Sequence, residues 1–204
     1  MNKRLETFCD GIFAIAITLL ILEIKVPSIV SIHSSADLKH RLLFDWPSWF
    51  AFLLSFISMF IAWVNHHHFM KQISPEKTSN SFMYAHGLFV LTLIVYPFTT
   101  SLLAEYLNTP YLKFPVFIYC LMNTVHAASW VLICHSALRP VNLGENEAKT
   151  KYIAGLRKNI SFTVIFNIAM CALAFWFPII AVSLTALAWL IYLIMGITLS
   201  PINN

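Results

Sequence analysis

Charged residues and glycine are both scarce in this sequence of 204 residues. Charged side chains make up 11% of it, glycine occurs 5 times, and hydrophobic residues account for 59%. The mean hydropathy of +0.74 lies outside the usual range of soluble domains. The composition therefore predicts a polytopic membrane protein and excludes a soluble enzyme or a nucleic-acid binder.

Several familiar motifs are absent as well. The sequence contains no glycine-rich phosphate loop, no HExxH, no GxSxG and no TVGYG-type filter. The four cysteines lie in or beside apolar segments and show no CxxC spacing; they are Cys9, Cys120, Cys134 and Cys171. These absences disfavour a disulfide framework and a thiolate metal site. We predict a protein that is not an enzyme and has no metal and no cofactor.

Six apolar segments predict an all-α membrane protein, with six transmembrane helices in a single domain over residues 1–204. The segments cover about residues 5–27, 46–70, 82–106, 111–137, 158–178 and 180–199. Asp10 lies inside the first segment and no small-x-small cleavage pattern follows, so we expect this segment to be retained. The polar segment 139–152 is predicted to be a turn of mixed charge.

The distribution of lysine and arginine predicts the orientation of these helices. Nine basic residues fall on the side of the termini, namely Lys3, Arg4, Lys71, Lys77, Arg139, Lys149, Lys151, Arg157 and Lys158. Four fall on the other side, namely Lys25, Lys39, Arg41 and Lys113. The positive-inside rule then places both termini in the cytoplasm.

The first segment is unusually polar at its ends. Its uninterrupted apolar run, Gly11 to Leu22, has only 12 residues. A lipid-exposed span needs about 20, so a spanning helix must carry Asp10 at one end and Glu23 and Lys25 at the other. Such a helix is expected to face protein or water rather than lipid.

Ile15, Leu19 and Leu22 fall on one stripe of this helix, with Thr18 beside them. Ordinary core packing is one explanation for such a stripe. The other requires several copies of the helix around an axis, where the stripe would form aliphatic rings that gate by dewetting. In that arrangement Glu23, near the outer mouth, would concentrate cations.

Ionisable side chains also gather at the inner end of the first two helices. Arg4, Glu6 and Asp10 lie on successive turns, and Arg4 is a natural partner for Asp10 unless it serves only as an interfacial anchor. The second helix ends in the three consecutive histidines 66–68. Neighbouring helical residues point about 100° apart, so these rings cannot readily converge on one ion. We predict a hydrogen-bonding role for one of them.

Together these motifs resemble the prokaryotic members of the transmembrane protein 175 potassium channels. The run Arg4-x-x-x-Phe8-Cys9-Asp10 resembles the family signature Arg-x-x-x-Phe-Ser-Asp. Two later motifs also match, Trp63-x-Asn65-His66-His67 and Pro97-Phe98-x-Thr100-x-Leu102-Leu103-x-Glu105-Tyr106. The resemblance covers roughly the first half of the chain.

This resemblance implies a potassium-permeable, weakly selective cation leak channel in a prokaryotic plasma membrane. It implies a homotetramer whose pore is lined by the first helix, with K⁺ and other monovalent cations as the permeating ions and the lipid bilayer as surroundings. The constriction carries over to Ile15, Leu19 and Leu22, and a threonine layer carries over to Thr18. An inner structural network carries over to Arg4, Phe8, Cys9, Asp10, Trp63 and either His66 or His67.

Two rival functions remain open at this point. A proton-coupled secondary transporter would titrate Asp10 and the histidines during turnover. No inverted repeat and no glycine-broken helix is visible, which counts against it. A membrane metalloenzyme would need His86, His126 or His135 to complete a site with the histidine run.

Overall fold

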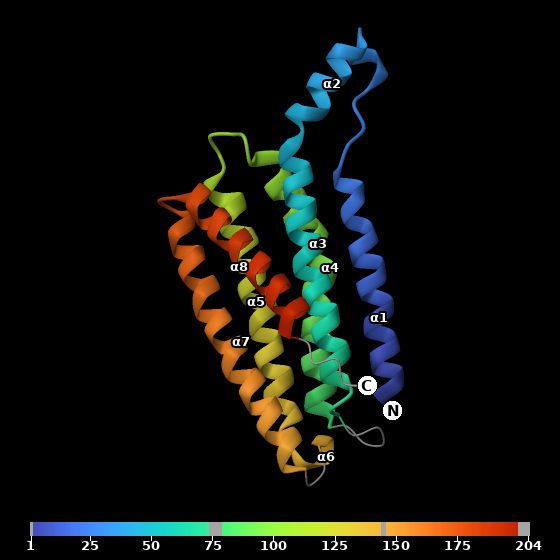
Figure 1. Cartoon of the computed structure of the whole chain (residues 1–204), viewed down its shortest axis with the longest axis vertical. Helices are drawn as coiled ribbons and strands as arrows, with labels where there is room; N and C mark the ends of the chain where they lie inside the picture. Colours follow the sequence, from blue (N-terminus) through green and yellow to red (C-terminus); the bar gives the residue numbers. More distant parts are fainter. Residues whose placement is uncertain (1, 74–78, 144–145, 200–204) are drawn as a thin grey trace.

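The computed structural model describes residues 2–73, 79–143 and 146–199. Among these residues it contains helices and no strand (Figure 1). Six of the helices are long and apolar enough to cross a membrane. This confirms the predicted all-α fold with six spans. Lys77, one of the basic residues counted on the inner side, lies outside the described residues.

The six long helices lie close to the predicted segments. They are α1 (Asn2–Leu19), α3 (Trp46–Met70), α4 (Asn80–Tyr106), α5 (Lys113–Ala137), α7 (Glu147–Ala174) and α8 (Pro178–Leu199). A 3-10 segment, Leu20–Glu23, extends α1. Shorter elements are the 3-10 turn Ile29–Ser31 and the helices α2 (Ser35–Phe44) and α6 (Pro140–Leu143).

The predicted turn over residues 139–152 is wrong. This segment contains α6 and the first residues of α7, which begins at Glu147. The side chain of Asn146 caps α7, because its Oδ1 accepts a hydrogen bond of 3.0 Å from the backbone N–H of Lys149. Hydropathy locates only the apolar part of a helix, so it missed these charged turns, which precede the apolar part.

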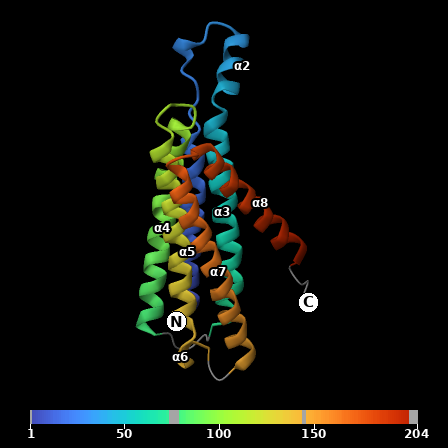
Figure 2. The ribbon, with the colours of Figure 1, turned by 90° about the vertical axis from the view of Figure 1, so that its left-hand side faces the viewer.

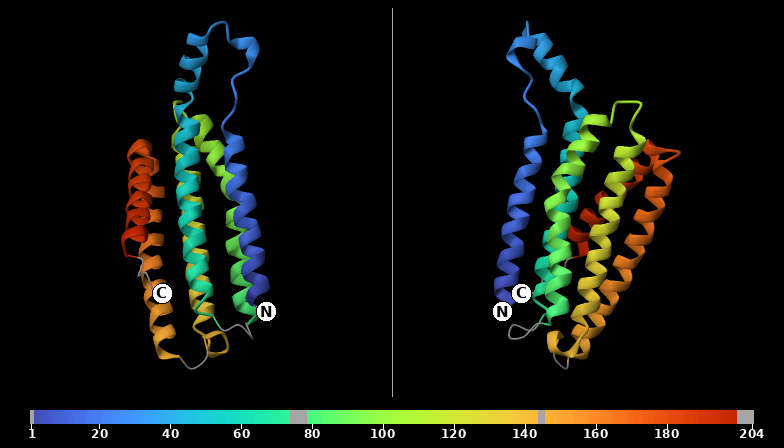
Figure 3. Two further views of the ribbon diagram at one scale, coloured as in Figure 1. Left: turned by 45° about the vertical axis from the view of Figure 1, so that its right-hand side comes forward. Right: turned by 180° about the vertical axis from the view of Figure 1, so that it is seen from behind.

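The long helices form an elongated bundle in which α3, α4 and α5 pack side by side. On one side α1 packs against α3 and α4, and on the opposite side α7 packs against α5 (Figure 3). The last helix, α8, contacts α3, α5 and α7 and then diverges from the bundle (Figure 2). At the end away from α6, α2 extends beyond the other helices (Figure 1).

Buried hydrogen bonds join the central helices. Tyr96 on α4 donates to Oδ1 of Asn123 on α5 at 2.6 Å. Thr100 on α4 donates to Oγ of Ser55 on α3 at 2.7 Å, and Ser55 lies 3.2 Å from the hydroxyl of Tyr119 on α5. Such bonds between apolar helices fix their register, since an unpaired polar group would be costly there.

All four cysteines are free and buried.

Candidate functional site

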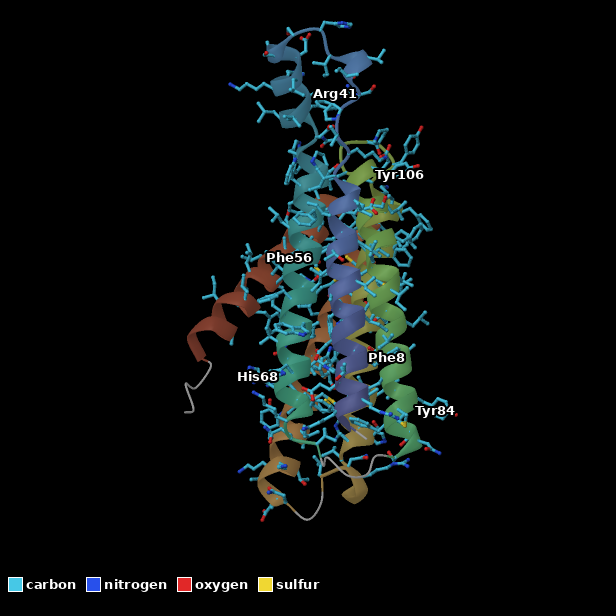
Figure 4. The ribbon with its side chains drawn as sticks, turned by 90° about the vertical axis from the view of Figure 1, so that its right-hand side faces the viewer. Phe8, Arg41, Phe56, His68, Tyr84 and Tyr106 are labelled. Atoms are coloured by element: carbon cyan, nitrogen blue, oxygen red, sulfur yellow. The ribbon has the colours of Figure 1, made fainter. Side chains whose placement is uncertain are left out.

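The candidate site is α1, which has one buried and one open face. Cys9, Phe13, Ala16 and Leu20 are at most 3% exposed. Their spacing of three or four residues keeps them on one side of the helix, where α3 and α4 cover them. Figure 4 views α1 from its open side, where none of the other described helices covers it.

The predicted aliphatic stripe lies on the open side. Ile15 is 61% exposed, Leu19 43% and Leu22 69%. Core packing within the chain therefore does not explain the stripe. Thr18 is also exposed, although its hydroxyl donates to the carbonyl of Ala14 at 2.8 Å and so turns back toward its own helix. Leu22 belongs to the 3-10 segment rather than to a continuous α-helix.

Two acidic residues, Glu23 and Glu105, lie at the outer end of α1 and differ in whether they form an ion pair. Glu105 on α4 forms an ion pair with Lys25, with Oε2 and Nζ 3.3 Å apart, and both side chains are exposed. Glu23 is half-buried and forms no ion pair with another described residue. Of these two acidic residues, Glu23 is thus the one whose carboxylate has no ion-pair partner among the described residues.

At the inner end, polar contacts join α1 to α3. The indole N–H of Trp63 donates to Oδ1 of Asp10 at 3.1 Å. One turn earlier on α1, Oε1 of Glu6 lies 3.5 Å from Nδ1 of His67. The predicted pair of Arg4 with Asp10 is wrong, because Arg4 is exposed and has no ion-pair partner within the described residues. The indole takes the place beside Asp10 that the guanidinium was predicted to occupy.

The three consecutive histidines have different surroundings, as their helical spacing predicts. His68 is exposed and points away from the bundle (Figure 4), whereas His67 meets Glu6. His66 is fully buried, and within the described residues neither of its ring nitrogens has a hydrogen-bond partner. Of the three, His67 rather than His66 thus contacts the polar groups of α1. No group of three histidine, cysteine or acidic residues able to hold a metal occurs in the described ranges.

His66 belongs to an aromatic cluster that the sequence motifs did not predict. Its ring stacks on Phe89 at a centroid distance of 5.6 Å and meets His86 at 5.5 Å. Phe13 on α1 meets His66 at 5.9 Å and Phe89 at 5.7 Å. The signal in the sequence was weak, because these four residues come from three helices and share no motif.

The two remaining residues of the predicted network stand apart from its hydrogen bonds. Phe8 is 56% exposed, on the lower part of α1 (Figure 4). Cys9 is buried, and its thiol makes no hydrogen bond among the residues that the structure describes. The geometry thus brings together Asp10 with Trp63 and Glu6 with His67, while Arg4, Phe8 and Cys9 take no part in these contacts.

Comparison with known proteins assigns this chain to a family. A profile of the family described as the endosomal/lysosomal potassium channel TMEM175 matches residues 4–97. A potassium channel of a Chryseobacterium species is 33% identical over 194 residues, which are 92% of either chain. The chain belongs to the TMEM175 family. That family consists of potassium channels and not of enzymes.

Two further comparisons agree. A potassium channel of Chamaesiphon minutus is 46% identical over 116 residues, which cover 57% of this chain and 56% of that protein. The match thus spans little more than half the length of that relative. The crystal structure of a lysosomal potassium-selective channel TMEM175 homolog from Chamaesiphon minutus superposes with a TM-score of 0.84 and 31% identity. The superposition covers 96% of this chain and 97% of the chain in that crystal structure.

Proposed function

We propose that this protein is a potassium-permeable, weakly selective cation leak channel, assembled as a homotetramer around a pore lined by α1. Membership of a potassium channel family supports permeation of K⁺. The carrying observation is the open face of α1, where Ile15 and Leu22 are more than half exposed while the opposite face is buried. A six-helix chain with its first helix at one side has no central path of its own, so the path requires further copies.

The open face of α1 has the composition expected of a narrow pore. Gly11, Ala14 and Thr18 are exposed between larger aliphatic residues, so small and polar groups interrupt the apolar surface. In the tetramer, Ile15, Leu19 and Leu22 form successive constricting rings, and Thr18 adds a threonine layer. Ions pass when these rings are wetted and stop when they dewet. Glu23, which lacks an ion-pair partner in the described chain, attracts cations to the outer mouth.

The orientation of the proposed channel follows from charge. The start of α1, the end of α3 and the start of α7 lie at the same end of the bundle, where the basic residues gather (Figure 1). The positive-inside rule makes that end cytoplasmic, together with both termini. We place this multi-pass protein in a prokaryotic plasma membrane. In this orientation α2 lies on the outer side.

A flux measurement on purified protein in liposomes tests the proposal. A channel dissipates a potassium gradient passively and shows a reversal potential that shifts with the ratio of potassium to sodium. A proton-coupled transporter would instead move potassium in a fixed ratio to protons, and that result would refute the channel. The mass of the purified protein in detergent tests the tetramer separately, and a monomer that still conducts would overturn the proposed pore.

A further inference from the structure

A cavity of about 220 Å³ lies on the side of the chain away from α1. Residues of α3, α5, α7 and α8 line it. It shares no residue with the open face of α1, so the proposed pore does not account for it. Its polar lining residues include Asn65, His126, Asn159 and Tyr192, and two of its aromatic lining residues are Trp130 and Trp189.

The walls of this cavity combine aromatic rings with uncharged hydrogen-bonding groups. None of its lining residues is Lys, Arg, Asp or Glu. Among the described residues, the side-chain amides of Asn65 and Asn159 make no hydrogen bond, since Thr163 bonds to the backbone carbonyl of Asn159 rather than to its amide. These amides are therefore open to a ligand. A charged ligand would lose its hydration here without gaining a counter-charge. The chemistry therefore selects a neutral ligand with an apolar body and one hydroxyl or amide.

The volume and the position of the cavity limit the choice of ligand further. An engineered cavity of about 150 Å³ in another protein binds benzene, so 220 Å³ accommodates one ring with a polar substituent. Asn159 on α7 and Tyr192 on α8 are exposed, and α8 diverges from the rest of the bundle (Figure 2). The membrane spans α7 and α8 are mostly not buried within the chain. Apolar helix surfaces of this kind face the bilayer, so we expect the ligand to enter from the membrane.

Aromatic contacts connect the cavity wall to α1. The rings of Trp130 and His126 lie 5.0 and 5.2 Å from the ring of Phe89. Phe89 in turn lies 5.7 Å from Phe13, on the buried face of α1. A ligand that displaces Trp130 or His126 moves the ring against which α1 packs, since a close-packed interior transmits such shifts.

We propose that the cavity is a modulatory site for a neutral, ring-sized amphiphile drawn from the bilayer, and that its occupancy alters conduction through Phe89 and Phe13. The binding half of this proposal is independent of the proposed channel function. The modulatory half rests on it. The two halves are therefore measured separately.

Binding is tested with 4-bromophenol on the full chain in nanodiscs, with tryptophan fluorescence as the readout. Bromine quenches Trp130 and Trp189 on contact, so a saturable component is expected above the linear quenching caused by partition into lipid. Ala127→Phe fills the cavity and abolishes that component. Asn159→Leu, at an exposed position, leaves the fold intact and weakens binding about three- to tenfold through loss of a hydrogen bond.

Ala169→Phe controls for the added ring, because Ala169 is exposed on α7 and does not line the cavity, whereas Ala127 is buried. Asn159→Leu, at an exposed position, tests the same cavity without adding bulk to the core. Ala169→Phe keeps the saturable component. Linear quenching alone in the native protein overturns the binding site, and so does equal saturable quenching in native protein and both cavity variants.

Modulation is tested by potassium flux at the same membrane concentration of 4-bromophenol. The probe is expected to change flux through the native protein and the Ala169→Phe variant but not through Ala127→Phe. An equal change in all three overturns the coupling and indicates an effect on the lipid. If the native protein conducts nothing, the channel function and the modulatory half both fall, while the quenching curves still decide whether the cavity binds.

Discussion

Asp10 on α1 and Trp63 on α3 are joined by a hydrogen bond of 3.1 Å from the indole N–H to the carboxylate. It is a direct polar link between the proposed pore helix and the rest of the subunit. Because Asp10 lies within an apolar segment, the indole also supplies the donor that this carboxylate needs there. The position of α1 depends on this bond and on the packing of its buried face.

The variant Trp63→Phe keeps an aromatic ring and removes the donor. We expect it to lower the free energy of unfolding by about 0.6–2 kcal/mol, the range of interhelical hydrogen bonds in membranes. The thermal midpoint in detergent measures this. Asp10→Asn keeps an acceptor oxygen and should lose less. Trp49→Phe, at an exposed position on the same helix, is the control, and an equal loss in both tryptophan variants would contradict the role of the bond.

The variant Ile15→Asn places a polar side chain in the proposed constriction. We expect it to wet the ring and to raise sodium permeability relative to potassium. The shift in reversal potential under mixed gradients measures the change. Ile165→Asn is the matched control, because Ile165 is 63% exposed on α7, against 61% for Ile15 on α1. Unchanged selectivity in Ile15→Asn would remove this residue from the constriction.

The variant Glu23→Gln removes the unpaired charge at the outer end of α1. We expect conductance to fall roughly twofold or more at low salt, because local cation concentration drops. The difference should vanish near 1 M salt, where the screening length is about 3 Å. Glu105→Gln, whose charge is already paired with Lys25, should change conductance less. A loss of conductance in Glu23→Gln that is the same at low and high salt would indicate a structural role for Glu23 instead.

The variant His66→Phe replaces an imidazole that has no hydrogen-bond partner among the described residues. We expect unchanged or higher thermal stability, because a buried polar group without a partner is replaced by an apolar ring of similar shape. His126→Phe is the counterpart. It loses the contact of 2.8 Å between His126 and the hydroxyl of Thr92, which still donates to the carbonyl of Phe89, and should be destabilised by about 0.5–1.5 kcal/mol. The reverse order of stability would indicate that His66 has an essential polar partner.

The spans were predictable because hydropathy reports directly on burial in lipid. The segment 46–70 coincides with α3, and the start of α1 lies close to its predicted position. The start of α7 was not predictable in this way, because its first turns are charged and depend on the Asn146 cap. Local hydrogen bonds, rather than hydropathy, set that boundary.

The exposed face of the site was predictable from the sequence, and its contacts were predictable only in part. Helical periodicity placed Ile15, Leu19 and Leu22 together, and the structure leaves all three exposed. Charge predicted Arg4 as the partner of Asp10, whereas the structure supplies Trp63, which the family resemblance had already grouped with Asp10 in one network. The aromatic cluster around Phe89 was not predictable either, because contacts between distant segments produce no periodic pattern in a single sequence.

The burial of all four cysteines has a practical consequence for mapping the ion path. Three of them are fully buried and Cys171 is 9% exposed, so aqueous thiol reagents meet almost no native target. Single cysteines introduced along the open face of α1 can therefore be labelled on an unmodified background. Modification rates along that helix, with and without permeating ions, would trace the water-accessible route residue by residue.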